Sequence, residues 1–203
     1  MSNDTYVVAV DGLSALRDLE TIPNAVKRAA LQAVNKTVTR TRTSSARAMR
    51  EQVKFPARYL SGEDGRLAIT KRATAESLEG SITGRFRPTS LARFVTSGAV
   101  GRRTGVRIEV APGFAKFMRR AFLIRLRAGT ADLDTTSNLG LAIRLKPGER
   151  IENKKKMIQM SGNLYLLYGP SVSQVFATVA EDEAPGAADY LEAEFLRLME
   201  LGR

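Results

Sequence analysis

The chain has 203 residues, of which 43% are hydrophobic and 26% are charged, and its net charge at pH 7 is +11. A chain of this length buries enough apolar surface for one globular domain. It contains neither cysteine nor histidine, which excludes disulfides and removes the commonest general base and metal ligand. Composition therefore disfavours most enzyme classes, and we expect no catalysis, no cofactor and no metal site.

Membrane insertion is not expected either. No stretch approaches the ~20 consecutive apolar residues that a transmembrane helix needs, and residues 1–20 lack the basic-then-apolar order of a signal peptide. We therefore expect a soluble protein of the cell interior that does not bind membranes.

The charge is distributed unevenly along the chain. Residues 1–20 carry a net charge of −3, residues 21–60 carry +8, residues 61–130 carry +9, residues 131–180 carry +2 and residues 181–203 carry −5. A basic middle between acidic ends suits a polyanion such as DNA, and it equally suits head-to-tail contact between copies of one subunit. Composition leaves both alternatives open.

The N-terminal part of the sequence predicts a strand and then helices. Residues 6–10 (YVVAV) form a short β-rich run, read as a strand or extended arm within residues 1–20. The sequence TIPN at residues 21–24 is a helix start signal, and apolar residues spaced by three or four predict a long helix to about Val53. The hydroxyl-rich residues 37–45 favour a bend in it. A single helical turn at residues 56–62 and a second short helix at residues 65–73 complete a helical region over residues 21–75.

Residues 76–170 have the pattern of a β-sheet. We expect strands over residues 77–83, 91–96, 105–111, 120–127, 139–145 and 163–170. Alternation in residues 120–127 predicts Phe122, Ile124 and Leu126 on a buried face and Arg125 and Arg127 on a wet face. Residues 97–104 and 130–138 are expected to be loops.

Residues 171–203 predict a C-terminal helix with an interruption at Ala184-Pro185-Gly186. The fold class is therefore α+β: a long N-terminal helix and a C-terminal helix packed on a mainly antiparallel sheet, with extended loops or arms, in one domain spanning residues 1–203.

The basic residues are the main candidates for a functional surface. Arginine and hydroxyl side chains grip phosphates without reading sequence, but a solvated helix face near partner subunits explains the same run of charges. The candidates for contact with DNA or with other subunits are Lys36, Arg40, Arg42, Arg47, Arg50, Arg102, Arg103, Arg125 and Arg127.

Other motifs argue against catalysis and nucleotide binding. No phosphate-binding glycine loop occurs between a predicted strand and a predicted helix. Asp132 and Asp134 are spaced as metal ligands are, but no calcium-loop pattern follows them. No serine has a histidine to activate it.

Three segments together resemble the minor tail protein Z, or tail-completion, family of tailed bacteriophages. They are the small-residue helix AALQAVNKT at residues 29–37, the basic segment RLAITKRAT at residues 66–74 leading through strands to RRAF at residues 119–122, and the passage from GPSV at residues 169–172 to Leu201. The order of features matches over nearly the whole chain, whereas the acidic ends and the residue 6–10 strand depart from the family pattern.

The resemblance implies a structural virion protein that completes the head-proximal end of the tail. It also implies a ring of six copies at the head–tail junction, or neck, assembled in the host bacterial cytoplasm. The implied partners are the chain itself, the tail terminator, tail tube and head–tail connector proteins, and packaged double-stranded DNA bound non-specifically. Two alternatives stay open: a sequence-independent nucleic-acid-binding protein of the bacterial host, and a hydrolase that uses only Asp or Glu.

Overall fold

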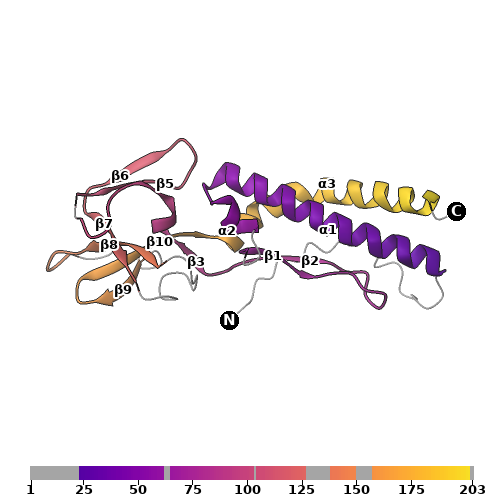
Figure 1. Cartoon of the computed structure of the whole chain (residues 1–203), viewed down its shortest axis with the longest axis horizontal. Helices are drawn as coiled ribbons and strands as arrows, with labels where there is room; N and C mark the ends of the chain where they lie inside the picture. The colour runs from indigo at the N-terminus through magenta and orange to yellow at the C-terminus, as the bar shows by residue number, and fades with distance from the viewer. Residues whose placement is uncertain (1–22, 62–64, 103, 127–137, 150–156, 202–203) are drawn as a thin grey trace. The chain divides into compact units, whose positions relative to one another are not determined.

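The computed structural model describes residues 23–61, 65–102, 104–126, 138–149 and 157–201. It confirms the predicted α+β class, with two long helices and several antiparallel sheets (Figure 1). The helices are α1 (Asn24–Gln52), α2 (Ala57–Ser61), the 3-10 helix η3 (Leu91–Phe94) and α3 (Val172–Leu201). The strands are β1 (Leu67–Lys71), β2 (Ser81–Gly84), β3 (Pro88–Ser90), β4 (Val95–Ser97), β5 (Val106–Glu109), β6 (Ala115–Met118), β7 (Ala121–Arg125), β8 (Leu139–Arg144), β9 (Met157–Ser161) and β10 (Leu164–Ser171).

The chain forms two compact units. The helical unit comprises the described residues of Met1–Met49, Ala57–Phe86 and Val172–Arg203, and the sheet unit comprises those of Arg50–Pro56 and Arg87–Ser171. The predicted strand at residues 6–10 lies outside the described residues.

Helix α1 matches the predicted long helix and is continuous through residues 37–45. The hydroxyls of Thr37, Thr39 and Thr43 donate to the carbonyl oxygens four residues earlier, over 2.8, 2.8 and 2.9 Å. The helix is therefore compatible with these side chains because each hydroxyl finds an acceptor within its own backbone. The helix does not break at these residues. The predicted turn at residues 56–62 is confirmed as α2.

Residues 65–73 do not form the predicted short helix. Leu67–Lys71 is a strand that pairs antiparallel with β2, with Leu67 opposite Gly84 and Ile69 opposite Ile82. Leu67 and Ile82 are almost fully buried, so pairing with β2 and burial of these side chains outweigh the local helical pattern. The strand predicted at residues 77–83 is shorter in the structure, where β2 begins at Ser81 and ends at Gly84.

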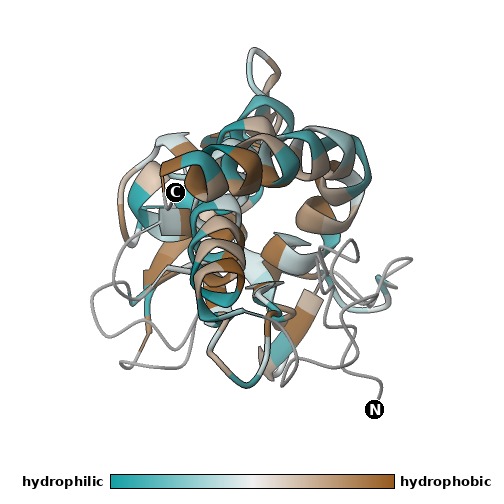
Figure 2. Cartoon of the chain, turned by 90° about the vertical axis from the view of Figure 1, so that its right-hand side faces the viewer, coloured by the Kyte–Doolittle hydropathy of each residue, from teal (hydrophilic) through white to brown (hydrophobic). Residues whose placement is uncertain are grey.

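Helix α3 runs through Pro185 without the predicted interruption. Its buried positions Ala180, Ala187, Leu191 and Glu194 keep one helical phase on both sides of Pro185. Pro185 itself is exposed. Packing of one continuous buried side therefore outweighs the cost of a proline in a helix. Figure 2 shows hydrophilic and hydrophobic residues both recurring along the helices, as expected for helices with one buried side.

The sheet unit contains two antiparallel sheets. One has the strand order β3-β10-β8-β7, with β9 also paired to β10, and the other has the order β4-β5-β6. A parallel bridge joins Val100 to Leu123, and the amide of Gly101 donates to the carbonyl of Leu123 over 2.9 Å. The predicted strands near residues 105–111, 139–145 and 163–170 correspond to β5, β8 and β10.

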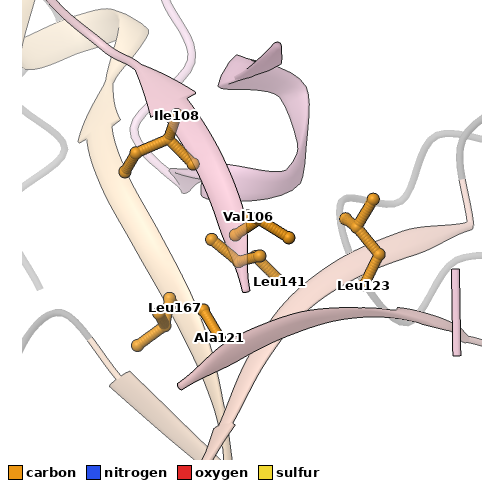
Figure 3. Packing of buried hydrophobic residues seen from close by; sticks show 6 residues of the cluster. All are labelled: Val106, Ile108, Ala121, Leu123, Leu141 and Leu167. Carbon is orange, nitrogen blue, oxygen red and sulfur yellow. The ribbon is translucent and has the colours of Figure 1, made fainter. Parts of the chain in front are cut away.

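Strand β7 is buried on both faces, which corrects the prediction of one core face and one wet face. Figure 3 shows Val106 and Ile108 of β5 facing Ala121, Leu123, Leu141 and Leu167 of the larger sheet. The opposite face of β7 contributes Phe122 to a second cluster with Leu126, Ala142, Leu166 and Tyr168. Arg125 is exposed, as predicted.

Only the last two residues of the predicted strand at residues 91–96 lie in a strand, which is β4 (Val95–Ser97). Leu91–Phe94 is a 3-10 helix whose first turn is capped by Ser90, because the Ser90 hydroxyl accepts from the amide of Ala92 over 3.3 Å. Phe94 is buried and contacts Phe55, with their ring centroids 5.7 Å apart. The short strands β3, β6 and β9 were not predicted. Strand β6 is mostly exposed and β9 bears no regular alternation of buried residues, so neither carries a period-two signal.

Candidate functional site: the basic groove of helix α1

The two long helices of the helical unit carry opposite charges. Helix α1 has seven basic residues and one acidic residue, a net charge of +6, and α3 has seven acidic residues and one basic residue, a net charge of −6. Three pairs of side chains join the helices, and they show that the helices run antiparallel. Lys36 contacts Glu194, the Arg40 guanidinium lies 4.3 Å from the ring centroid of Tyr190, and Ser44 donates to Glu183.

Glu194 is the most buried acidic group of this pair of helices. Its side chain is 8% exposed, Lys36 Nζ lies 2.6 Å from its Oε1, and Arg197 NH2 lies 2.7 Å from the same oxygen. Hydrogen bonds from Arg197 and then from Lys36 lower the pKa of Glu194 from its ordinary value of 4.5 to about 2. Glu194 is therefore a carboxylate at neutral pH, and it offsets part of the positive charge of α1.

A shallow groove of about 790 Å³ follows the exposed side of α1. It combines cations, hydroxyls, amides and one aromatic ring. Its lining residues are Leu31, Gln32, Asn35, Lys36, Thr39, Arg40, Thr43, Ser44, Arg47, Arg72 and Tyr190. Such a surface offers several donors to an anion and a ring to an apolar group.

The structure brings three of the predicted site residues together in this groove: Lys36, Arg40 and Arg47. Arg42 is placed elsewhere, because its Nε donates to the carbonyl of Leu67 over 3.0 Å and its side chain is half-buried. Arg42 therefore ties α1 to β1. Arg50 is exposed near the end of α1 and does not line the groove.

The other predicted site residues belong to the sheet unit. Arg102 and Arg125 are both exposed, and each follows the parallel bridge between Val100 and Leu123 by two residues. Because the bridge is parallel, the segments that carry Arg102 and Arg125 run in the same direction from it along one edge of β7. Arg103 and Arg127 lie outside the described residues.

Two charged features were not predicted from the sequence. Arg72 and Tyr190 complete the groove of α1, although they come from after β1 and from α3. In the sheet unit, a hollow of about 470 Å³ is lined by Arg119, Arg120, Phe122, Arg144 and Lys146. The adjacent arginines 119 and 120 are visible in the sequence and could have indicated this hollow. The other lining residues, Arg144 and Lys146, come close to them only because β7 pairs with β8.

Arg120 is held in place within that hollow. Its two terminal nitrogens each lie 2.7 Å from an oxygen of Glu149, and one also donates to the carbonyl of Arg144 over 2.9 Å. The Arg120 hydrogen bonds, together with the Lys146 amide, lower the pKa of Glu149 to about 2. Glu149 thus offsets the charge of Arg120.

The outer side of α3 is acidic. Glu181, Asp189, Glu192 and Glu200 are exposed and lie within one side of the helix, with Leu196 among them. Leu196 is 53% exposed. The residues of α3 that pair with α1 lie on the opposite side, so this acidic side is available to another molecule.

The described ranges bear on two expectations from the sequence, which concern metal-ligating and membrane-spanning residues. No group of three or more acidic side chains there could hold a metal ion. Asp132 and Asp134, the predicted but disfavoured carboxylate pair, lie outside these ranges. Within the same part of the chain, no helix has the length and apolar character needed to cross a membrane.

Tyr168 and Phe94 are buried core residues, whereas Phe86 is 67% exposed. Comparison of the chain with protein-family models, with curated proteins and with solved structures finds no match.

Proposed function

We propose that this chain is a structural virion protein of a tailed bacteriophage, one that completes the head-proximal end of the tail as part of an oligomeric ring at the neck. The observation that carries the proposal is that exposed cations and exposed carboxylates occupy separate surfaces of the same chain. The groove of α1 presents Arg40 and Arg72, and the outer side of α3 presents Glu181, Asp189, Glu192 and Glu200.

Separate surfaces of opposite charge favour association between copies. A contact between two different patches is heterologous, and it closes into a ring when the rotation between copies allows. The family resemblance adds the location and the partners: the head–tail junction, the tail terminator, the tail tube and the connector, with DNA passing nearby. A chain with this role performs no catalysis and requires no cofactor.

Electron microscopy of the purified full chain tests the ring, and deletion of the gene from its phage tests the role. We expect closed rings of six copies. We also expect the deletion phage to accumulate filled heads and separate tails, with joining restored by the wild-type gene. Normal joined particles from the deletion phage would contradict the proposal.

A second candidate function is sequence-independent binding of nucleic acid. It is favoured by the groove of α1, where four cations lie among the hydroxyls of Thr39, Thr43 and Ser44. Against it, Glu194 and Glu183 already engage Lys36 and Ser44. Fluorescence anisotropy with random duplex DNA tests whether the chain binds nucleic acid independently of sequence. Binding that weakens by about 10²-fold between roughly 50 and 200 mM salt, as four phosphate contacts imply, would support this function, provided that Arg40→Ala with Arg72→Ala weakens binding and lowers the salt dependence.

A further inference from the structure

The hairpin formed by β5 and β6 is an exposed element of the sheet unit. Strand β6 is an edge strand that pairs only with β5 among the described strands, and its residues Ala115, Lys116 and Phe117 are exposed. Phe114 and Phe117 are 79% and 55% exposed. Exposed phenylalanines in the turn before an edge strand and on that strand are typical of a protein-binding surface.

The hairpin has a fixed shape. Glu109 Oε2 lies 2.5 Å from Lys54 Nζ, and Glu109 Oε1 accepts from the amide of Gly113 over 2.9 Å, which holds the turn. Gly105 has a φ of +85°, and a β-carbon there would lie 2.5 Å from the Phe117 ring. The absence of a side chain at position 105 therefore lets the Phe117 ring lie against the backbone. A preformed surface loses little entropy on binding.

The hairpin is apolar and basic. A hollow of about 470 Å³ at its tip is lined by Ile108, Val110, Ala111, Gly113, Phe114, Ala115 and Lys116. Lys116 is exposed and pairs with Ile108, so both lie on the face of the hollow, whereas Arg107 pairs with Phe117 on the other face. Lys54 neutralises Glu109, the acidic residue of β5. The hairpin thus fits an apolar side chain that is flanked by carboxylates.

The outer side of α3 has this chemistry. Leu196 is exposed, and Glu192 and Glu200 lie one helical turn before it and one turn after it. We propose that the β5–β6 hairpin of one copy docks on the outer side of α3 of a second copy, with Leu196 at the hairpin hollow and Glu192 facing Lys116. Lys116 beside an apolar hollow favours a carboxylate beside a leucine over DNA, because a phosphate backbone has no apolar group to fill the hollow. The inference rests on the proposed function, for which it names the contact between copies.

Cysteine cross-linking tests the contact directly, because the natural chain has no cysteine. Ala115→Cys and Ala193→Cys place thiols at exposed alanines beside the hairpin hollow and beside Leu196. Mixing the two single-cysteine proteins under mild oxidation is expected to give the mixed dimer as the main product. The matched control replaces Ala193→Cys with Ala57→Cys, an exposed alanine of α2. Equal yields from the test and control mixtures would overturn the inference.

A charge swap provides the second test. Lys116→Glu or Glu192→Lys alone is expected to weaken self-association by ~10-fold or more at low salt, because each brings like charges together. Mixing the two variants is expected to restore the contact, which sedimentation velocity measures. Arg58→Glu, an exposed residue of α2, should leave association unchanged. Rings that persist unaltered in both single variants would overturn this contact alone, whereas absence of rings from the wild-type chain would overturn the proposed function as well.

Discussion

Ser44 and Ser45 are adjacent in α1, yet their hydroxyls have opposite surroundings. Ser44 donates to Glu183 and lies 3.1 Å from the carbonyl of Thr41. Ser45 is fully buried, and its hydroxyl has no hydrogen-bond partner in the described part of the chain. A buried hydroxyl without a partner costs free energy, because it has lost its bonds to water.

Replacing Ser45 by alanine is therefore expected to stabilise the protein. The alanine removes the unpaired hydroxyl and adds a helix propensity gain of about 0.5 kcal/mol, so the free energy of unfolding should rise by about 0.5–1.5 kcal/mol. Urea unfolding followed by circular dichroism measures the change. Ser44→Ala is the matched control: it gains the same propensity but loses the contact with Glu183. If Ser44→Ala proved the more stable variant, this reading of Ser45 would be wrong.

The contact of Glu194 with Arg197 and Lys36 predicts a pH-dependent stability. The pKa of Glu194 is lowered from 4.5 to about 2 in the folded chain. The ionised form is therefore favoured by folding, and its contribution is fully present above about pH 4.5 and is lost as the pH falls toward 2. We expect the stability difference between the wild-type chain and Glu194→Gln to be constant from pH 7 to 5 and to shrink below that.

Urea unfolding of both proteins between pH 7 and 2.5 tests this window. Glu181→Gln provides the control, because Glu181 is an exposed residue of the same helix. Its stability difference from the wild-type chain should stay near zero at every pH. A difference for Glu194→Gln that stayed constant down to pH 2.5 would show that this carboxylate is not held by its two cations.

Sequence patterns predict the long elements of this fold better than the short ones. Helix α1 follows from a regular apolar spacing over many residues, which few alternatives can match. Residues 65–73 have an equally helical local pattern, but the burial of Leu67 opposite β2 decides their structure. The interruption predicted at Pro185 was wrong for the same reason, because packing on both sides of this residue keeps α3 continuous. Tertiary contacts of this kind are absent from a local pattern.

The candidate groove was predicted only in part for a related reason. Lys36, Arg40 and Arg47 share one side of α1 through helical spacing, so the sequence brings them together. Arg72 and Tyr190 join them only through the packing of other elements against α1. Arg42 has the same charge as its neighbours, and its different role is set by a single carbonyl in β1.

Arg42 is expected to act in stability and not in binding. Arg42→Ala should lower the free energy of unfolding by about 1–2 kcal/mol, because it removes a charged donor from the carbonyl of Leu67. Arg50→Ala, at an exposed position of the same helix, should change it by less than about 0.5 kcal/mol. Thermal and urea unfolding compare the two. Equal changes in the free energy of unfolding for both substitutions would show that Arg42 does not stabilise the fold through the Leu67 carbonyl.

Gly84 at the end of β2 approaches the first turn of α3 closely. A β-carbon at this position would lie 2.9 Å from the Cα and 3.0 Å from the amide nitrogen of Ser173, both of them backbone atoms. The same region is joined by a hydrogen bond of 3.0 Å from the Ser173 amide to the carbonyl of Arg85. Because backbone cannot move aside as a flexible side chain can, an added methyl group here must displace either the strand or the helix.

Gly84→Ala is therefore expected to lower the free energy of unfolding by about 2 kcal/mol or more. Gly186→Ala is the matched control, because a β-carbon there would meet nothing within 4 Å and the residue lies inside α3. Alanine exceeds glycine in helix propensity, so Gly186→Ala should raise the free energy of unfolding by about 0.8 kcal/mol. Urea unfolding of both variants measures whether the free energy of unfolding falls for Gly84→Ala and rises for Gly186→Ala. A Gly84→Ala protein as stable as the wild-type chain would mean that β2 and α3 are not held this close.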